Sequence, residues 1–138
     1  MAKREKPLVR PLSPFMYYMN AKTWHTMGVS ILHRITGVAL TAGSVLLVYW
    51  LTSAAMGADA YARALAVFAW WPTQVVLLGF AFSFCYHFLN GIRHLVWDTG
   101  RGFDLKVARN SALFVAVGSI VLTAAVVLAF CLRSGGAV

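Results

Sequence analysis

Three long apolar runs, separated by short polar segments, divide this chain. They cover about residues 30–53, 66–92 and 111–132. A helix rises about 1.5 Å per residue, so about 20 residues cross a hydrocarbon core of about 30 Å, and each run has that length. The pattern predicts an all-α membrane protein with three transmembrane helices, in a single transmembrane domain over residues 1–138.

The segment before the first run, residues 1–28, is polar and basic and carries Pro7, Pro11 and Pro14. Proline interrupts helices and restricts the residue before it, so these prolines predict an extended arm on the membrane surface or against a partner. The segment has no apolar core followed by a small-residue cleavage site. We therefore expect no secretory signal there.

Composition supports a membrane protein. Hydrophobic residues make up 60% of the chain and charged residues 12%, whereas about a quarter of a soluble domain is charged. The formal net charge of +8 raises the alternative of a nucleic-acid-binding protein. The basic residues flank the apolar runs, however, without the interleaved aromatic residues of a single-strand binding groove. They are better interpreted as signals of membrane topology.

Lysine and arginine residues gather on one side of the predicted membrane. Six precede or open the first run, up to Arg34, and four lie between Arg93 and Arg109, while Arg63 and Arg133 are alone on the other side. Ten against two places the N-terminus inside and the C-terminus outside by the positive-inside rule. The histidines at 33, 87 and 94 then lie in the inner half of the bundle.

Ionisable residues at the end of the second run, His87–Gly100 (HFLNGIRHLVWDTG), are the main candidates for chemistry. On a helix, Gly91 falls roughly 40° from His87 and His94 about 20° the other way, and Ser83 lies on the same stripe. Such a face can receive a flat, metal-containing ring, with an imidazole ligand and a glycine that leaves clearance. The alternative is a helix end with a packed, hydrogen-bonded His87.

A second polar stripe follows one face of the first run, with His33 to one side of it: Ser30, Arg34, Gly37, Thr41 and Ser44. Small and hydroxyl residues on one line are typical of close helix packing, which is the interpretation favoured for Gly37, Thr41 and Ser44. A guanidinium inside a span is costly and needs a polar partner. For Arg34 both snorkelling to the surface and ligand binding stay open.

The two cysteines point to no redox or metal chemistry. Cys85 lies in the inner half of the second run and Cys131 near the outer end of the third, too far apart in depth for a disulfide. The chain has no Cys-x-x-Cys-His for covalent haem and too few cysteines for an iron–sulfur cluster. It also has no phosphate-binding glycine loop, so an independent kinase is not expected.

Three sequence blocks together resemble a known family. They are RPLSP at Arg10–Pro14, SILHRITG at Ser30–Gly37 and HFLNGIRHLVWD at His87–Asp98. Their combination and order are similar to the cytochrome b subunit of succinate dehydrogenase, the larger membrane anchor of respiratory complex II. One departure is Phe15, where many relatives have a histidine after the first block, and it affects the arm rather than the haem.

The resemblance implies roles for particular residues. His87 matches the axial ligand of a b-type haem, whose other ligand is a histidine of a second, smaller anchor subunit. His33, Arg34 and His94 match residues near the haem propionates. Ser30 and Arg34 match residues of the ubiquinone site, where a hydroxyl donor and a positive charge suit quinone reduction.

Two further ionisable residues have no assigned role. His25 precedes the first block. Asp98 belongs to the block of His87, and pairing with Arg93 or Arg101 and proton delivery both stay open for it.

The family also implies partners: a flavoprotein subunit, an iron–sulfur subunit and the second anchor subunit. Electrons from succinate would arrive through the flavin and the iron–sulfur centres, so this chain would not bind succinate and would not be catalytic alone. The expected location is the inner (cytoplasmic) membrane of a bacterium, ahead of the mitochondrial inner membrane. The alternatives are a fumarate reductase anchor, a haem-free structural anchor and, from another class, a small transporter or channel.

Overall fold

The computed structural model describes residues 24–135, and this part of the chain is entirely helical apart from short connections. A π-helical turn, η1 (Trp24–Gly28), is followed by α2 (Val29–Ala55), α3 (Ala58–Ala69), α4 (Trp71–Asp98) and α5 (Leu105–Gly135). Three of these helices, α2, α4 and α5, are long and apolar enough to cross a membrane. The predicted all-α fold with three helices of transmembrane length is therefore confirmed. Residues 1–23 of the predicted arm lie outside the described part.

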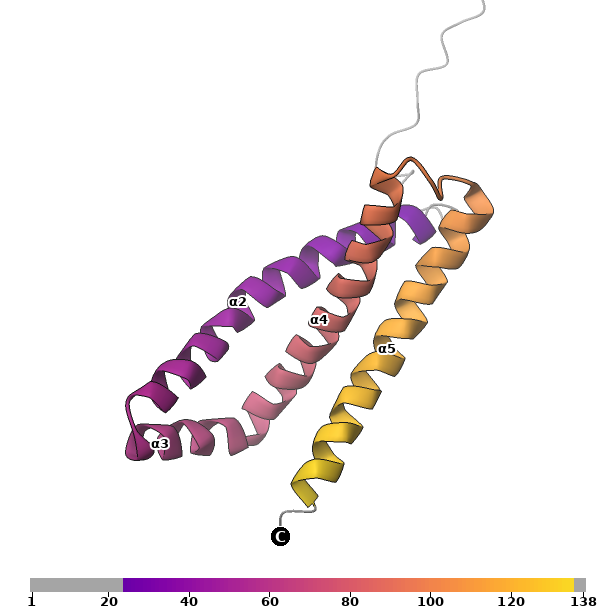
Figure 1. Cartoon of the computed structure of the whole chain (residues 1–138). Helices are drawn as coiled ribbons and strands as arrows, with labels where there is room; N and C mark the ends of the chain where they lie inside the picture. Colours follow the sequence, from indigo (N-terminus) through magenta and orange to yellow (C-terminus); the bar gives the residue numbers. More distant parts are fainter. Residues whose placement is uncertain (1–23, 136–138) are drawn as a thin grey trace, which may run out of the picture.

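The central helix is α4, which packs against α2 on one side and α5 on the other (Figure 1). At one end of the bundle, α2 and α4 come together beside η1 and the loop between α4 and α5; we call this the η1 end. At the opposite end α2 and α4 separate, and α3 crosses between them. We call this the α3 end.

The helix α3 was not predicted. The break between α3 and α4, at Trp70, divides the second apolar run. The backbone of Trp70 is extended, with φ −68° and ψ 130°, and α4 begins at the next residue with Pro72 in its first turn. Proline suits the first turn of a helix but clashes with the preceding turn inside one, so a single helix through this point is unfavourable. As a result α4 runs from Trp71 to Asp98, whereas the predicted run covered 66–92.

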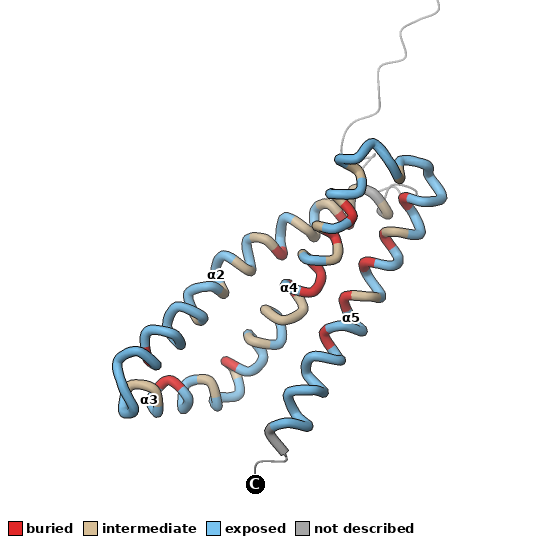
Figure 2. Tube along the Cα trace, viewed as in Figure 1, coloured by how far each residue is buried: buried red, intermediate tan, exposed pale blue. Residues whose placement is uncertain are grey.

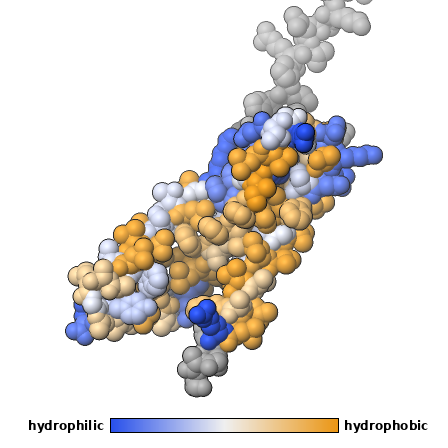
Figure 3. Space-filling model, viewed as in Figure 1, coloured by the Kyte–Doolittle hydropathy of each residue, from blue (hydrophilic) through white to orange (hydrophobic). Residues whose placement is uncertain are grey.

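Buried residues gather toward the η1 end (Figure 2). The core there is formed by Val29, Tyr86, Ala112 and Val115, from α2, α4 and α5. The Tyr86 hydroxyl donates a hydrogen bond of 3.0 Å to the carbonyl oxygen of Val29, which joins the first turn of α2 to α4. Most other side chains of the long helices are apolar and exposed (Figure 3), as expected for surfaces that face lipid or another membrane subunit.

A buried arginine joins three elements at the same end. Arg93 of α4 is 5% exposed. Its guanidinium donates to neutral groups of η1, α4 and α5: Ser111 Oγ at 2.9 Å, the Ala108 carbonyl at 3.2 Å, Asn90 Oδ1 at 3.4 Å and the His25 carbonyl at 3.5 Å. We call this set the arginine clamp. Asp98, considered as a partner of Arg93, is not among these groups.

The arginine clamp extends to the loop between α4 and α5. The Arg93 guanidinium carbon lies 4.0 Å from the centroid of the Trp97 ring, a cation–π contact. The Trp97 indole in turn donates a hydrogen bond of 3.2 Å to the carbonyl of Gly102. Gly102 has φ +86°, a conformation that favours glycine, and a Cβ atom there would lie 3.3 Å from Cδ1 of the indole ring.

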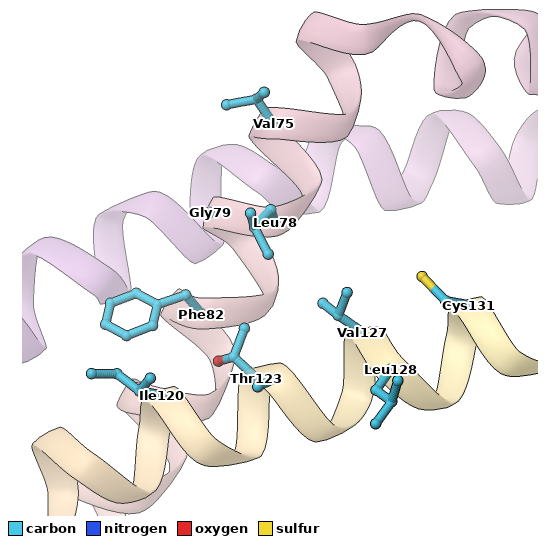
Figure 4. A pocket seen from close by; sticks show the side chains of 10 residues that line it. Val75, Leu78, Gly79, Phe82, Ile120, Thr123, Val127, Leu128 and Cys131 are labelled. Carbon is cyan, nitrogen blue, oxygen red and sulfur yellow. The ribbon is translucent and has the colours of Figure 1, made fainter.

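Toward the α3 end, α4 and α5 leave a cleft of about 740 Å³ between them (Figure 4). Its walls are almost entirely apolar and include Val75, Leu78 and Phe82 from α4 and Ile120, Val127 and Leu128 from α5. The helices therefore pack tightly at one end and loosely at the other.

Candidate functional site

The histidines singled out in the sequence meet at the η1 end. His33 comes from α2, and His87 and His94 come from α4. The His33 and His87 rings stack with centroids 3.8 Å apart and planes 14° from parallel, and His94 lies 5.1 Å from His33 on a tilted plane. Packing of α2 on α4 thus makes one cluster of residues from two sequence blocks.

The imidazole of His87 is held through its Nδ1 atom. Nδ1 lies 3.1 Å from the carbonyl oxygen of His33 and 3.4 Å from Oγ1 of Thr36. A carbonyl oxygen only accepts hydrogen bonds, so Nδ1 carries the proton and Nε2 the free lone pair. Within residues 24–135 no hydrogen bond involves Nε2 of His87. This is the arrangement of an imidazole that is oriented through one nitrogen and available to a metal through the other.

Close contact between the helices requires glycine beside this ring. A Cβ atom at Gly37 would lie 3.1 Å from Cε1 of His87, tighter than an ordinary contact. The packing interpretation is thus confirmed for Gly37. Thr41 and Ser44 are exposed, and each donates a hydrogen bond to a carbonyl of α2 itself, at 3.1 and 2.7 Å. A second close approach was not predicted: a Cβ atom at Gly43 would overlap the Phe80 ring.

The other members of the predicted α4 stripe differ in burial. Ser83 is buried, whereas Gly91 and His94 are half-buried. A Cβ atom added at Gly91 would meet nothing within 4 Å, so the clearance expected at this glycine is present. His94 lies edge-on to the Trp97 ring, with centroids 5.3 Å apart, which connects the histidine cluster to the arginine clamp.

Ser30 and Arg34 lie in the first turns of α2, at the same end of the bundle but outside the stacked rings. Ser30 is half-buried and Arg34 is exposed. Neither side chain forms a hydrogen bond or an ion pair with another residue in the described range. The Arg34 guanidinium therefore keeps its donors available at the η1 end.

Two buried polar atoms near the cluster have no hydrogen-bond partner in the part of the chain described: Nδ1 of His33 and Nδ2 of Asn90. Buried polar atoms in proteins are usually paired, so an unpaired one calls for a ligand, a water molecule or another subunit. No group of three or more His, Cys, Asp or Glu side chains between residues 24 and 135 is arranged to hold a metal ion.

Some residues of this site were not predicted. Thr36 was not singled out, although it stands three residues after His33 and so returns to nearly the same face of α2. Asn90 was not named either, although a polar residue between His87 and His94 in an apolar run signals an interior position. Arg93 was interpreted as a flanking charge and as one candidate partner of Asp98, and its burial was not predicted.

Three membrane-length helices with an oriented histidine cluster at one end define a multi-pass membrane protein. Over residues 6–126 the chain matches the succinate dehydrogenase/fumarate reductase transmembrane subunits, and it belongs to this family. The resemblance found in the sequence blocks is thereby confirmed.

Individual relatives agree with this assignment. The chain is 36% identical over 121 residues to the succinate dehydrogenase cytochrome b556 subunit of Paracoccus denitrificans, covering 88% of this chain and 92% of the relative. It is 39% identical over 114 residues to that of Rickettsia prowazekii, covering 83% and 87%. The human mitochondrial cytochrome b560 subunit is 34% identical over 111 residues, covering 78% of this chain and 64% of the relative.

Proposed function

We propose that this chain is the cytochrome b membrane anchor of a succinate:quinone oxidoreductase and that His87 is an axial ligand of its haem b. The observation that carries the proposal is the 3.1 Å contact between Nδ1 of His87 and the His33 carbonyl, which leaves Nε2 as the donor to iron. The names of the relatives, cytochrome b556 and b560 subunits, support it. The second axial ligand would be a histidine of the smaller anchor subunit.

Other features of the cluster fit a haem. Gly91 leaves open space one turn from His87, as a flat ring requires. The unpaired Nδ1 of His33, together with His94 and Arg34, would hold the propionates through hydrogen bonds and charge. A bound haem supplies one-electron redox chemistry, and the protein's part is to position it and set its surroundings.

Ser30 and Arg34 would form this chain's part of the ubiquinone site. Quinone reduction adds two electrons and two protons, so the carbonyl oxygens need a hydrogen-bond donor and a positive charge as they become negative. The Ser30 hydroxyl would donate to one carbonyl oxygen, and the exposed Arg34 guanidinium would provide the charge. Both residues would lie near the aqueous surface of the membrane, where protons are available.

The remaining subunits and the orientation follow from the same assignment. A flavoprotein and an iron–sulfur subunit would dock at the η1 end and deliver electrons, so this chain would act without binding succinate. The exposed basic residues Arg101, Lys106 and Arg109 lie at that end, whereas Arg63 lies at the α3 end. This asymmetry in basic residues favours an orientation in which the η1 end faces the inside of a bacterial inner membrane.

The haem assignment is tested with His87→Ala in the assembled complex. We expect the α-band of the reduced-minus-oxidised spectrum to be lost or severely weakened, because iron loses one of its two protein ligands. His25→Ala is the control, since the structure uses His25 through its backbone carbonyl. A normal low-spin spectrum in assembled His87→Ala complex would overturn the ligand assignment. Absence of the α-band from the wild-type complex would instead show that the chain is a haem-free structural anchor.

The quinone assignment is tested with Ser30→Ala and Arg34→Leu. We expect quinone reductase activity to fall at least tenfold in Arg34→Leu, a loss of about 1.4 kcal/mol in transition-state stabilisation. Succinate oxidation by a soluble dye acceptor should stay near the wild-type value. Arg109→Leu, which removes another exposed arginine at the same end, is the matched control. Equal loss of both activities would indicate failed assembly rather than a quinone site.

A further inference from the structure

Residues of α2 surround the imidazole of His87 on three sides. The His33 ring covers one face of it at 3.8 Å, Gly37 lies against its Cε1 edge, and its Nδ1 atom faces two oxygen atoms. One of these is the His33 carbonyl at 3.1 Å and the other is Thr36 Oγ1 at 3.4 Å. The proton on Nδ1 is therefore shared between a backbone acceptor and a side-chain acceptor.

The Thr36 hydroxyl is itself oriented by the backbone. Its oxygen lies 2.9 Å from the carbonyl of Leu32 and 2.9 Å from that of His33, so its proton is directed to these carbonyls. A hydroxyl that donates its proton in this way presents its lone pairs to other donors. The Nδ1–H group of His87 is the donor that reaches it.

Hydrogen bonds from threonine to its own helix are common. We therefore compare the burial of Thr36, and its contact with His87, with those of another threonine of α2. Thr41, on the same helix, bonds the Gly37 carbonyl at 3.1 Å but is exposed. Thr36 is 3% exposed, and its oxygen also faces an imidazole of another helix. Back-bonding alone requires neither feature.

We propose that Thr36 is a positioning residue for the metal-binding imidazole of His87 and tunes the electron donation of that imidazole to haem iron. This rests on the proposed function and deepens it. Hydrogen bonds to Nδ1–H increase the basicity of the ligating nitrogen, and such second-sphere contacts adjust the reduction potential of a haem. The backbone acceptor from His33 remains in every variant, whereas the hydroxyl of Thr36 can be removed.

The direction of the effect follows from charge. An imidazole whose Nδ1–H is strongly hydrogen-bonded donates more electron density and stabilises ferric over ferrous iron. Removing the Thr36 hydroxyl weakens this donation, so the reduction potential of the haem rises. The remaining bond to the His33 carbonyl is the shorter of the two, which keeps His87 in place.

The experiment compares Thr36→Val, Thr36→Ser and Thr41→Val in the purified complete complex. Valine keeps the shape of threonine and removes the hydroxyl, while serine keeps the hydroxyl. The readouts are the midpoint potential from a spectroelectrochemical titration and the low-spin ferric signal in electron paramagnetic resonance. We expect an upward shift of the potential in Thr36→Val, recovery toward wild type in Thr36→Ser and no shift in Thr41→Val.

Each outcome decides the proposal. A wild-type potential in haem-loaded Thr36→Val overturns it, and so does an equal shift in Thr41→Val, which would reflect a general effect on α2. If Thr36→Val loses its haem, retention of haem at the wild-type potential in Thr36→Ser supports the proposed role of the hydroxyl. Loss of haem in both variants overturns the proposal. Absence of low-spin haem from the wild-type complex would instead refute the proposed function.

Discussion

The two ends of the bundle are built in opposite ways. The η1 end holds the buried core, the arginine clamp and the stacked histidines. At the α3 end, α2 and α4 separate, a cleft of about 740 Å³ lies between α4 and α5, and another of about 420 Å³ is lined by α2, α3, α4 and Phe130 of α5. The walls of both clefts are mainly apolar.

This difference follows from what each end has to satisfy inside a membrane. Buried polar groups need fixed partners, because hydrocarbon offers none, and the η1 end supplies partners for Arg93 and His87 from neighbouring helices. Apolar walls have no such requirement, since lipid tails are as apolar as leucine. The chain therefore packs closely where the histidine cluster lies and leaves the α3 end to lipid or other subunits.

The largest effect is expected from removing the arginine clamp. Arg93→Leu removes all four hydrogen bonds of the guanidinium and leaves the buried Oδ1 of Asn90 without a partner, which we expect to cost about 3 kcal/mol or more. The measurement is the temperature at which the detergent-purified complex loses its haem and elutes as aggregate. Arg101→Leu removes an exposed arginine from the loop that follows α4 and is expected to have little effect. Equal stability of the two variants would contradict the role of the clamp.

An intermediate effect is expected at the glycine beside His87. The new methyl group of Gly37→Ala would press on Cε1 of the imidazole, so α2 and α4 must separate or the ring must turn. We expect a cost of about 1 to 3 kcal/mol, as for overpacking elsewhere, with a lower haem content and a shifted low-spin signal. Haem content per complex is the measurement. A wild-type spectrum and stability would show that the contact is not tight.

The smallest effect is expected at the loosely packed end. Gly79 lines the α4–α5 cleft, and a Cβ atom added there meets nothing within 4 Å. Gly79→Ala should be neutral or should stabilise α4 by up to about 1 kcal/mol through its higher helix propensity. Thermal unfolding of the complex measures this. A loss as large as that of Gly37→Ala would mean that the cleft is tightly occupied by a neighbour in the complex.

The sequence predicted the features that depend on one helix at a time. Length and hydropathy were enough for the three spans, and helical periodicity placed His87, Gly91 and His94 on one stripe. The helix α3 was missed because its segment is too short to cross a membrane and was interpreted as a connection. The break at Trp70 was missed because hydropathy continues through it, although Pro72 favours a helix start there.

Features that depend on two helices at once were not predictable in the same way. The contact of Thr36 with His87 requires the register between α2 and α4, which no periodicity within one helix contains. The burial of Arg93 was not predicted, because two of its neutral partners come from η1 and α5. A pattern within one helix shows only a charge beside an apolar run, which was interpreted as a topology signal. The proposed roles of Ser30 and Arg34 rest on the family resemblance, since neither side chain forms a hydrogen bond with another residue in the described range.

The most direct measurement is ligand rescue at His87. In the complete complex, His87→Gly leaves a cavity that added imidazole can fill, so the ferric low-spin signal in electron paramagnetic resonance should be lost and should return with millimolar imidazole. We expect this loss and this recovery if His87 is the axial ligand. A low-spin signal that is unchanged in His87→Gly without imidazole would contradict it, because iron would then be held by another residue.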